Sequence, residues 1–394
     1  MVPSPKKTDT GANKGGCVAS TSSETNRPNK VVYVYSPELV KLCDQLLKVP
    51  RRASIIHTLI EAYGLLQHMI IVPPLPTGKD ELTAFHSQDF IDCLEKLNHE
   101  EDNEKDEELQ QQFGLGYDCP VMPQVFDFSC AVAGATLRAA QSLIDCECRV
   151  AINWFGGWHH AKRDEAAGFC YVNDVVLGIL KLREKFDKVL YIDIDLHHGD
   201  GVEDAFCFTP KVMTVSFHKL CPGFYPGTGT LKDVGMGKGK FYSVNVPLKD
   251  GISEEQYCNI FTCIIDEIYQ SYNPDALALQ CGVDTIADDP MQSFNLTPAA
   301  VAKCVRHVLD WSLPTLLVGG GGYNLANSAR CWAYLTASVL DHKLPTEIPE
   351  HEYFLEYGPG YQLDISPSHL PNQNREEYLE QVSSTIRGNM QNVT

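Results

Sequence analysis

Short runs of apolar and β-branched residues recur along the chain and predict buried β-strands. Runs with few polar residues between the apolar ones are typical of strands that are covered on both faces. A sheet of about eight strands accounts for all of them. The predicted strands lie at 31–35, 68–72, 149–154, 188–194, 212–217, 241–246, 276–280 and 315–320.

Helical patterns lie between many of these strands. Apolar residues recur at helical spacing in four clear segments, 131–144, 175–186, 254–270 and 298–309. Alternating strands and helices predict an α/β fold with a mainly parallel sheet flanked by helices. The polar segment 1–29 is expected to be a disordered N-terminal tail. No linker-like stretch interrupts 30–394, so we expect one domain there.

Polar residues collect where five of the predicted strands end. In parallel α/β sheets, ligands bind beyond the carboxyl ends of the strands. One such segment is compatible with a capped turn, but five favour a shared site. The segments read FGGWHH, DLHHGDG, HKLCPGFYPGTG, CGVDTIADDP and GGGGYN.

The segment YIDIDLHHGDG carries the clearest chemical signal. Asp193, Asp195 and His197 alternate, so on a strand they point to one side. Aspartates are rare in buried strands and need a cation or strong donors there. Carboxylate and imidazole ligands suit zinc or another divalent metal, and Asp284 is the candidate third ligand. A structural network of Asp and His without a metal is the alternative.

Charge and composition argue against some classes of function. Thirty-two basic and 51 acidic residues give a net charge of −19, which argues against nucleic-acid binding and favours a basic partner. No apolar run is long enough to span a membrane, and no signal peptide is evident, so we expect a soluble intracellular protein. The 15 scattered cysteines fit free thiols, and the acidic run 99–112 is expected to be a solvated loop.

Rival catalytic motifs are missing from the sequence. It has no HExxH pair, no phosphate-binding loop and no Gly-x-Ser-x-Gly nucleophile. The segment GGGGYN has Asn324 where a dinucleotide-binding loop needs its last glycine.

Five motifs, GGWHHA, GFCYVND, DIDLHHGDGVE, PGFYPGTG and GGGGYN, occur in this order. They resemble the zinc-dependent class I histone deacetylases, which have the arginase/deacetylase fold. The resemblance covers nearly all of 30–394 and implies a lysine deacetylase that removes acetyl or other acyl groups. It further implies histones and other nuclear proteins, such as cohesin, as substrates, a nuclear and cytoplasmic location, and activity without an obligatory partner.

The resemblance also implies roles for individual residues of the catalytic centre. Asp195, His197 and Asp284 would bind Zn²⁺ or another divalent metal such as Fe²⁺, which activates the attacking water. The implied catalytic residues are His160 as general base and acid, His159 as its partner, Asp193 and Asp200 as their orienting carboxylates, and Tyr323 as the stabiliser of the oxyanion.

Substrate and cation sites follow from the same resemblance. Phe169 and Tyr225 would form the walls of a narrow tunnel for the acyl-lysine stem, with Gly168, His197 and Met291 beside it and Asp118 at the rim. A structural K⁺ would lie near Asp193, Asp195, His197, Ser216 and Phe217. Tyr225 stands where the family usually has phenylalanine. Asp289 stands where we expect glycine, which predicts a more acidic rim loop.

Two other functions remain open at this point. One is a reader of acyl-lysine that has lost catalysis, although every predicted catalytic residue is present. The other is a hydrolase of small cationic substrates, such as acetylated polyamines.

Three residues raise regulatory hypotheses. Ser54 follows two arginines, which is typical of a basic-directed kinase site, but a helix N-cap explains it equally well. Cys119 and Cys170 fall near the predicted site, where a regulatory disulfide is the alternative to inert buried thiols.

Overall fold

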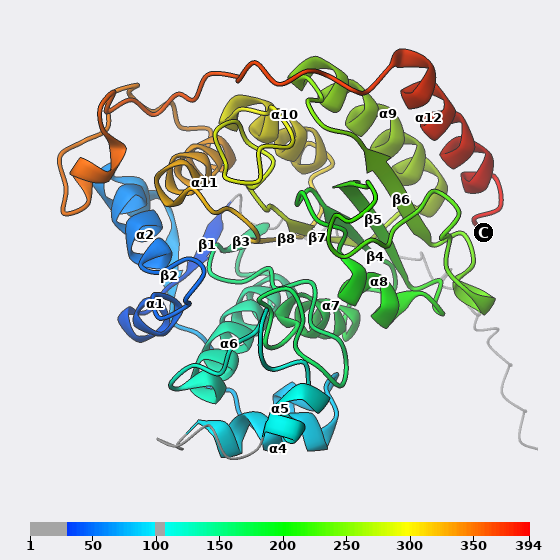
Figure 1. Ribbon diagram of the computed structural model, residues 1–394. Coiled ribbons are helices and arrows are strands. Elements are labelled where there is room, and N and C mark those ends of the chain that lie inside the picture. The colour runs from blue at the N-terminus through cyan, green and yellow to red at the C-terminus, as the bar shows by residue number, and fades with distance from the viewer. Residues whose placement is uncertain (1–29, 99–106) are drawn as a thin grey trace, which may run out of the picture.

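All eight predicted strands are present in the computed structural model, which describes residues 30–98 and 107–394. They form one sheet in the order β2-β1-β3-β8-β7-β4-β5-β6 (Figure 1). Every pairing is parallel, so the sheet is parallel throughout rather than mainly so. The strands are β1 Val31–Val34, β2 Ile70–Val72, β3 Val150–Asn153, β4 Val189–Asp193, β5 Val212–Lys219, β6 Ser243–Leu248, β7 Ala276–Gln280 and β8 Thr315–Val318.

Helices cover both faces of this sheet, as the alternation of strands and helices predicts (Figure 1). One face carries α6 Val125–Ile144, α7 Asp174–Arg183 and α8 Asp200–Phe206. The other carries α9 Glu254–Tyr272, α10 Pro298–Leu309 and α11 Leu325–Val339. The smaller helices are α1 Pro37–Cys43, α2 Arg52–Ala62, η1 Leu65–His68, α3 Lys79–Leu82, α4 Gln88–Leu97, α5 Glu107–Gln112, η3 Gly237–Gly239 and η4 Phe354–Tyr357.

The inner strands of the sheet are buried, and so is the edge strand β6, whereas the edge strand β2 is partly exposed. The strands β3, β8, β7 and β4 lie inside the sheet, and all their residues are buried. The strand β2 lies at the edge, where Ile70 and Ile71 are exposed. Uninterrupted apolar runs therefore form the strands that are covered by helices on both faces.

Local sequence sets where several helices begin. The hydroxyl of Ser253 accepts a hydrogen bond from Gln256 N at the start of α9. At the start of α10 the hydroxyl of Thr297 accepts one from Ala300 N, and Pro298 occupies the first turn.

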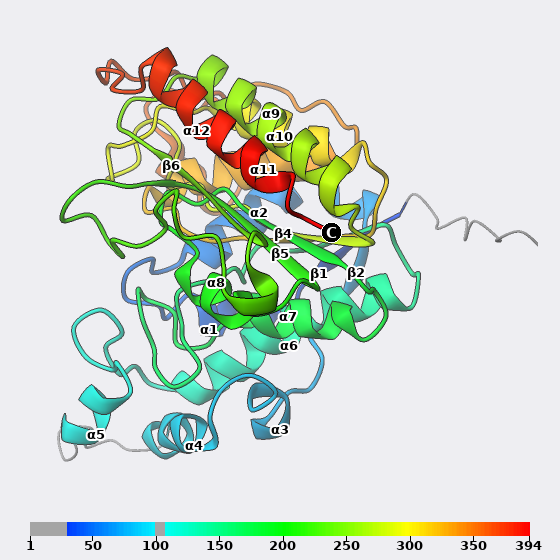
Figure 2. The same cartoon turned by 90° about the vertical axis from the view of Figure 1, so that its right-hand side faces the viewer.

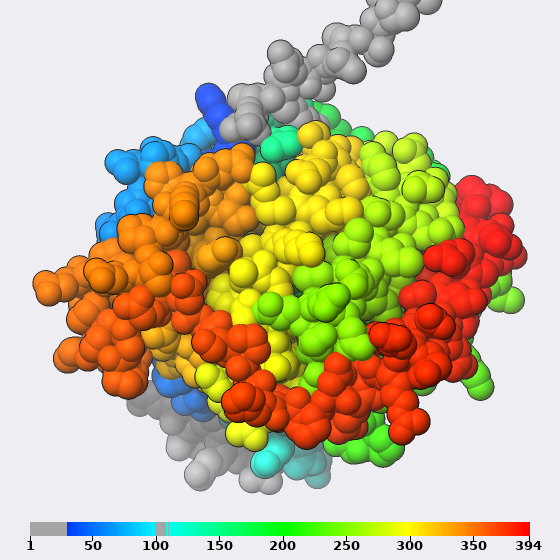
Figure 3. Space-filling model, turned by 90° about the horizontal axis from the view of Figure 1, so that it is seen from above, coloured from blue at the N-terminus to red at the C-terminus, as the bar shows by residue number. Residues whose placement is uncertain are grey.

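The C-terminal segment returns across the α9–α10 face and ends in α12 Glu376–Met390 (Figures 2 and 3). Helix α12 packs against α9, and its buried residues Leu379, Val382 and Ile386 join the main core. The described part of the chain thus shares one sheet and one core. None of its helices is both long and apolar enough to cross a membrane.

Three element predictions need correction. Helix α6 begins at Val125, six residues before the predicted segment 131–144. Strand β4 ends at Asp193, so Asp195 and His197 lie in the following loop. Residues 107–112 form helix α5, whereas the sequence predicted that they belong to a loop. The rest of that acidic run, 99–106, and the predicted tail, 1–29, lie outside the described residues.

Candidate metal centre and catalytic site

The strand order brings the predicted site segments together. Strands β3, β8, β7 and β4 are neighbours, and β5 follows β4. Because all are parallel, their carboxyl ends open at one edge of the sheet. The five polar segments recognised in the sequence therefore meet at this edge.

Asp195, His197 and Asp284 form a buried cluster whose ligand atoms all lie within 4.8 Å of one another. Nδ1 of His197 lies 3.2 Å from Oδ1 of Asp195 and 2.9 Å from Oδ2 of Asp284. The three residues that the sequence singled out as metal ligands thus come together. Leu196, which lies between Asp195 and His197, donates its N–H to the carboxylate of Asp284, 88 positions further along the chain.

The reason for this convergence differs from the prediction. Strand alternation cannot place these ligands, because the strand ends at Asp193. Instead, Asp195 N donates to the Asp193 carboxylate, and His197 N donates to the Asp195 carboxylate, each at 3.0 Å. Such bonds between a backbone N–H and a carboxylate two residues earlier define tight turns.

Gln280 and Gly321 both donate hydrogen bonds to the carboxylate of Asp195. Gln280 Nε2 donates to Oδ2 of Asp195 at 2.7 Å, and Gly321 N donates to the same oxygen at 2.8 Å. Sequence reasoning missed Gln280. One signal could have identified Gln280, because it is the last residue of a buried strand that leads into the site.

The cluster fits a divalent cation. Two carboxylates and one imidazole are a donor set that binds zinc and related metals. Burial and the negative charge of Asp195 raise the pKa of Asp284. A bound cation would offset the repulsion between these two carboxylates. Glycines make room beside the ligands, since a Cβ on Gly282 would lie 2.0 Å from Asp195 Oδ2 and one on Gly321 2.3 Å from Asp284 Oδ2.

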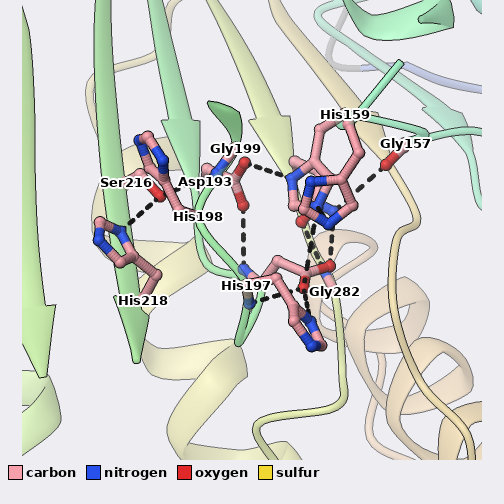
Figure 4. Close-up of polar contacts among 12 residues, drawn as sticks. Gly157, His159, Asp193, His197, His198, Gly199, Ser216, His218 and Gly282 are labelled. Carbon is pink, nitrogen blue, oxygen red and sulfur yellow. Dashed lines mark hydrogen bonds and ion pairs between the residues drawn. The ribbon is translucent and has the colours of Figure 1, made fainter. Parts of the chain in front are cut away.

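His159 and His160 lie beside this cluster, each with its own carboxylate. Nδ1–H of His159 donates to Asp193 Oδ2 at 2.7 Å (Figure 4). Nδ1–H of His160 donates to Asp200 Oδ1 at 2.8 Å. The two Nε2 atoms lie 3.1 Å apart. These are the pairings that the resemblance implied.

The two histidines have different charge states. Burial lowers the pKa of His159, but Asp193 and Asp195 outweigh it and raise the value to about 9. Burial and the neighbouring His159 lower the pKa of His160 to about 3, despite its bond to Asp200. The carboxylates beside His159 thus favour its protonated form, whereas burial and the neighbouring His159 favour a neutral His160.

The loop that carries the histidines is held by Asp174, which the sequence did not single out. Gly157 N and Trp158 N donate to its carboxylate at 3.0 and 2.8 Å. Gly157 has a φ of +99°, and a Cβ there would lie 2.2 Å from Gly319 O. Glycine is thus needed where the loops after β3 and β8 touch.

A cavity leads from the surface to the cluster, and Asp195 forms part of its lining. Phe169 and Tyr323 pack edge to face on its wall, with ring centroids 6.2 Å apart. Seven predicted site residues line it: Asp118, His159, His160, Gly168, Phe169, Asp195 and Tyr323. The sequence missed the contribution of 46–49 and Arg52 to this wall.

Tyr225 and Met291 do not line this cavity. The Tyr225 ring lies 5.0 Å from the His160 ring and nearly perpendicular to it, and it is 38% exposed. Tyr225 is therefore close to His160. Met291 is partly buried against the core.

Two of the residues predicted for K⁺ lie side by side across the ladder of β4 and β5. Asp193 is the register partner of Ser216. The Ser216 hydroxyl lies 2.9 Å from His218 Nδ1 and accepts a bond from Gly199 N (Figure 4). Phe217 packs with Phe261 in the core.

Two expectations at this edge of the molecule are wrong. Asp289 does not make the rim acidic, because it is 2% exposed. The left-handed backbone that favours glycine belongs to Asp288, with a φ of +64°. Ser54 is not a helix N-cap, since Arg51 precedes the first residue of α2. Ser54 lies inside α2, and its hydroxyl donates to the Asp44 carboxylate.

Cys119 and Cys170 are both free and buried. Burial raises the pKa of Cys119 to about 12 and that of Cys170 well above its usual value. Both sulfurs are therefore protonated thiols at neutral pH, which favours the inert alternative for this pair.

The chain is similar to a family of known proteins. The family model described as the histone deacetylase domain matches residues 46–339. The chain therefore belongs to the histone deacetylase family, and with it to the hydrolases that act as protein-lysine deacetylases. Both the resemblance and the arginase/deacetylase fold that it implied are confirmed.

Within this family the chain is similar to histone deacetylase 8. It is 58% identical to that protein of Danio rerio over 375 residues, which are 95% of this chain and 99% of the relative. It is 56% identical to histone deacetylase 8 of Xenopus tropicalis, over 92% of this chain and 98% of the relative. It is also 46% identical to histone deacetylase 1 of Homo sapiens, over 86% of this chain and 70% of the relative.

Proposed function

We propose that residues 30–394 hydrolyse acetyl and related acyl groups from lysine side chains of histones and other nuclear proteins such as cohesin. Asp195, His197 and Asp284 would hold the Zn²⁺, or another divalent metal such as Fe²⁺, that the reaction needs. One observation carries this proposal: the buried ligand cluster lies beside the paired histidines at the end of an aromatic-walled cavity.

The paired histidines divide the proton chemistry. A bound divalent ion supplies Lewis-acid polarisation of the substrate carbonyl and lowers the pKa of a water toward about 7. Neutral His160 accepts the proton of the attacking water and returns it to the leaving lysine nitrogen. Protonated His159, held by Asp193, stabilises the negative charge that develops. Asp193 and Asp200 fix the ring orientations.

Tyr323 stabilises the oxyanion. Burial and the negative charge of Asp284 raise the pKa of its phenol, so the hydroxyl keeps its proton and serves as a donor. Its ring stands perpendicular to that of His197, with centroids 6.4 Å apart. The hydroxyl thus supplies a hydrogen bond where the former carbonyl oxygen becomes negative.

Substrate recognition follows from shape and charge. The uncharged acyl-lysine stem lies along Gly168 and Phe169, with Tyr225 and Met291 beside it. Asp118 at the rim accepts hydrogen bonds from the substrate backbone. The net charge of −19 speeds encounter with basic histone tails.

The remaining expectations form part of this proposal. A K⁺ ion near Asp193, Ser216 and Phe217 stabilises the ends of the strands. The chain does not bind nucleic acid, acts in the nucleus and cytoplasm, and needs no partner for activity.

Turnover of two substrate classes tests the function. The zinc-loaded chain should hydrolyse an acetyl-lysine histone peptide at least tenfold more efficiently, by kcat/KM, than an acetylated polyamine. The reverse preference would instead indicate a hydrolase of small cationic substrates. Tight peptide binding without turnover would indicate a reader of acyl-lysine.

A further inference from the structure

Tyr323 follows a run of four glycines, Gly319 to Gly322, whose backbone can adopt many conformations. Gly320 and Gly322 have φ values of +156° and +141°. The glycines provide no side chain that could hold the phenol in place. Some other group must therefore fix the peptide that leads into Tyr323.

The carboxylate of Asp289 makes that contact. Its Oδ2 accepts hydrogen bonds from Tyr323 N at 2.8 Å and Asn324 N at 3.2 Å. Its Oδ1 accepts one from Met291 N at 2.9 Å. Only 2% of Asp289 is exposed, so this buried carboxylate directs its hydrogen bonds to backbone donors of two loops. One of these loops follows β7, and the other follows β8.

A second buried charge holds the same peptide group from the other end. Nη1 of Arg52 donates to Gly322 O at 2.9 Å, and Arg52 is 5% exposed. The carbonyl and the N–H of the Gly322–Tyr323 peptide are thus bound by groups of opposite charge. Rotation of this peptide would break both bonds, and hydrogen bonds to charged groups are stronger than neutral ones.

We propose that Asp289 is a positioning residue for Tyr323 in the hydrolytic reaction. The proposal rests on the role of Tyr323 in the proposed function. Asp289 reaches the phenol only through the backbone, because it binds the N–H of Tyr323. Asp289 lies in the loop after β7, where its other oxygen accepts a hydrogen bond from Met291 N, so its carboxylate joins this loop to the backbone of Tyr323.

The variant Asp289→Asn removes half of this arrangement. An amide has one acceptor oxygen, so its NH₂ group must face either Met291 N–H or the two N–H groups of Tyr323 and Asn324. With acetyl-lysine peptide we expect kcat to fall about tenfold or more, with little change in KM, because oxyanion donors act mainly in the transition state.

Asp288→Asn is the matched control. It removes one negative charge at the adjacent position, where the side chain is exposed. Asparagine tolerates the left-handed backbone of this residue. This control should keep wild-type kcat and KM. A kcat for Asp289→Asn equal to that of the control would overturn the proposal.

Combination with Tyr323→Phe separates positioning from general damage. If Asp289 acts through the phenol, adding Asp289→Asn to Tyr323→Phe should lower kcat by less than about twofold further. A further loss as large as that of Asp289→Asn alone would show that Asp289 acts elsewhere. Absence of wild-type turnover would instead refute the proposed function.

Amide hydrogen exchange provides a readout that needs no activity. The N–H groups of Tyr323 and Asn324 should be protected in the wild-type chain, and exchange there should quicken in Asp289→Asn but not in Asp288→Asn, at equal zinc content. If Asp289→Asn does not fold, the wild-type measurement decides. Rapid wild-type exchange at Tyr323 would refute the contact itself.

Discussion

His86 should make the protein sensitive to mild acid. It is 2% exposed, and its Nε2 accepts a hydrogen bond from Asn173 N at 3.0 Å. Its Nδ1 lies 3.3 Å from Arg163 O, so the proton of the neutral ring lies on Nδ1. Protonation of Nε2 would break the bond to Asn173, whose side chain caps α7 and donates to the carbonyl of His159.

The pKa of His86 gives the magnitude. Burial lowers it to about 4, and the carbonyl of Arg163 only partly opposes this. An unfolded histidine has a pKa of about 6.5, so the unfolded chain takes up a proton first as the pH falls. The stabilising contribution of neutral His86 is complete above about pH 6.5 and is lost as the pH falls toward 4. Between about pH 7.5 and 5 the loss is about 2 kcal/mol.

Urea unfolding of His86→Gln tests this value. The glutamine cannot take up a proton, so the free energy of unfolding should fall about 2 kcal/mol less than in the wild type between about pH 7.5 and 5. Comparing the two proteins cancels any loss of metal that both share. His68→Gln replaces an exposed histidine and should behave like the wild type. Equal pH dependence of His86→Gln and wild type would refute the reasoning.

Three further outcomes follow from the site. Tyr323→Phe should lower kcat about 10²–10³-fold while zinc content stays unchanged, and an intact kcat would show that the phenol has another role. Asp118→Ala should raise KM for peptides more than it lowers kcat, which unchanged peptide kinetics would contradict. Ser54→Glu should lower the melting temperature more than Ser54→Ala, because it adds charge beside Asp44; equal melting temperatures would argue against regulation by charge there.

The strands could be predicted well from sequence because burial on both faces leaves uninterrupted apolar runs. The start of α6 could not be predicted, because its first five residues include Asp127 and Ser129, which do not continue the apolar pattern. The expectation that strand alternation continues through Asp195 and His197 failed for a related reason. Side-chain turns replace the ladder after Asp193, and alternation of residue types looks the same in both.

The metal ligands could be predicted because strand ends concentrate them in short segments. The groups that hold these segments in place could not be predicted from the sequence. Asp174, Gln280 and Asp289 act on backbone or side-chain atoms that lie far away in the sequence, so no local spacing reveals them. The burial of Asp289 likewise depends on the loop after β8, which its own segment does not encode.

The most direct test of the account is to titrate the metal-free chain with Zn²⁺ while measuring both bound metal and hydrolysis of acetyl-lysine peptide. The wild type should bind one ion in its high-affinity site, and activity should rise in proportion to its occupancy. Asp195→Ala should lose both binding and activity, because it removes one of the three ligands. Full activity in the metal-free chain, or wild-type metal binding and turnover in Asp195→Ala, would contradict the assignment of Asp195, His197 and Asp284 as the metal centre.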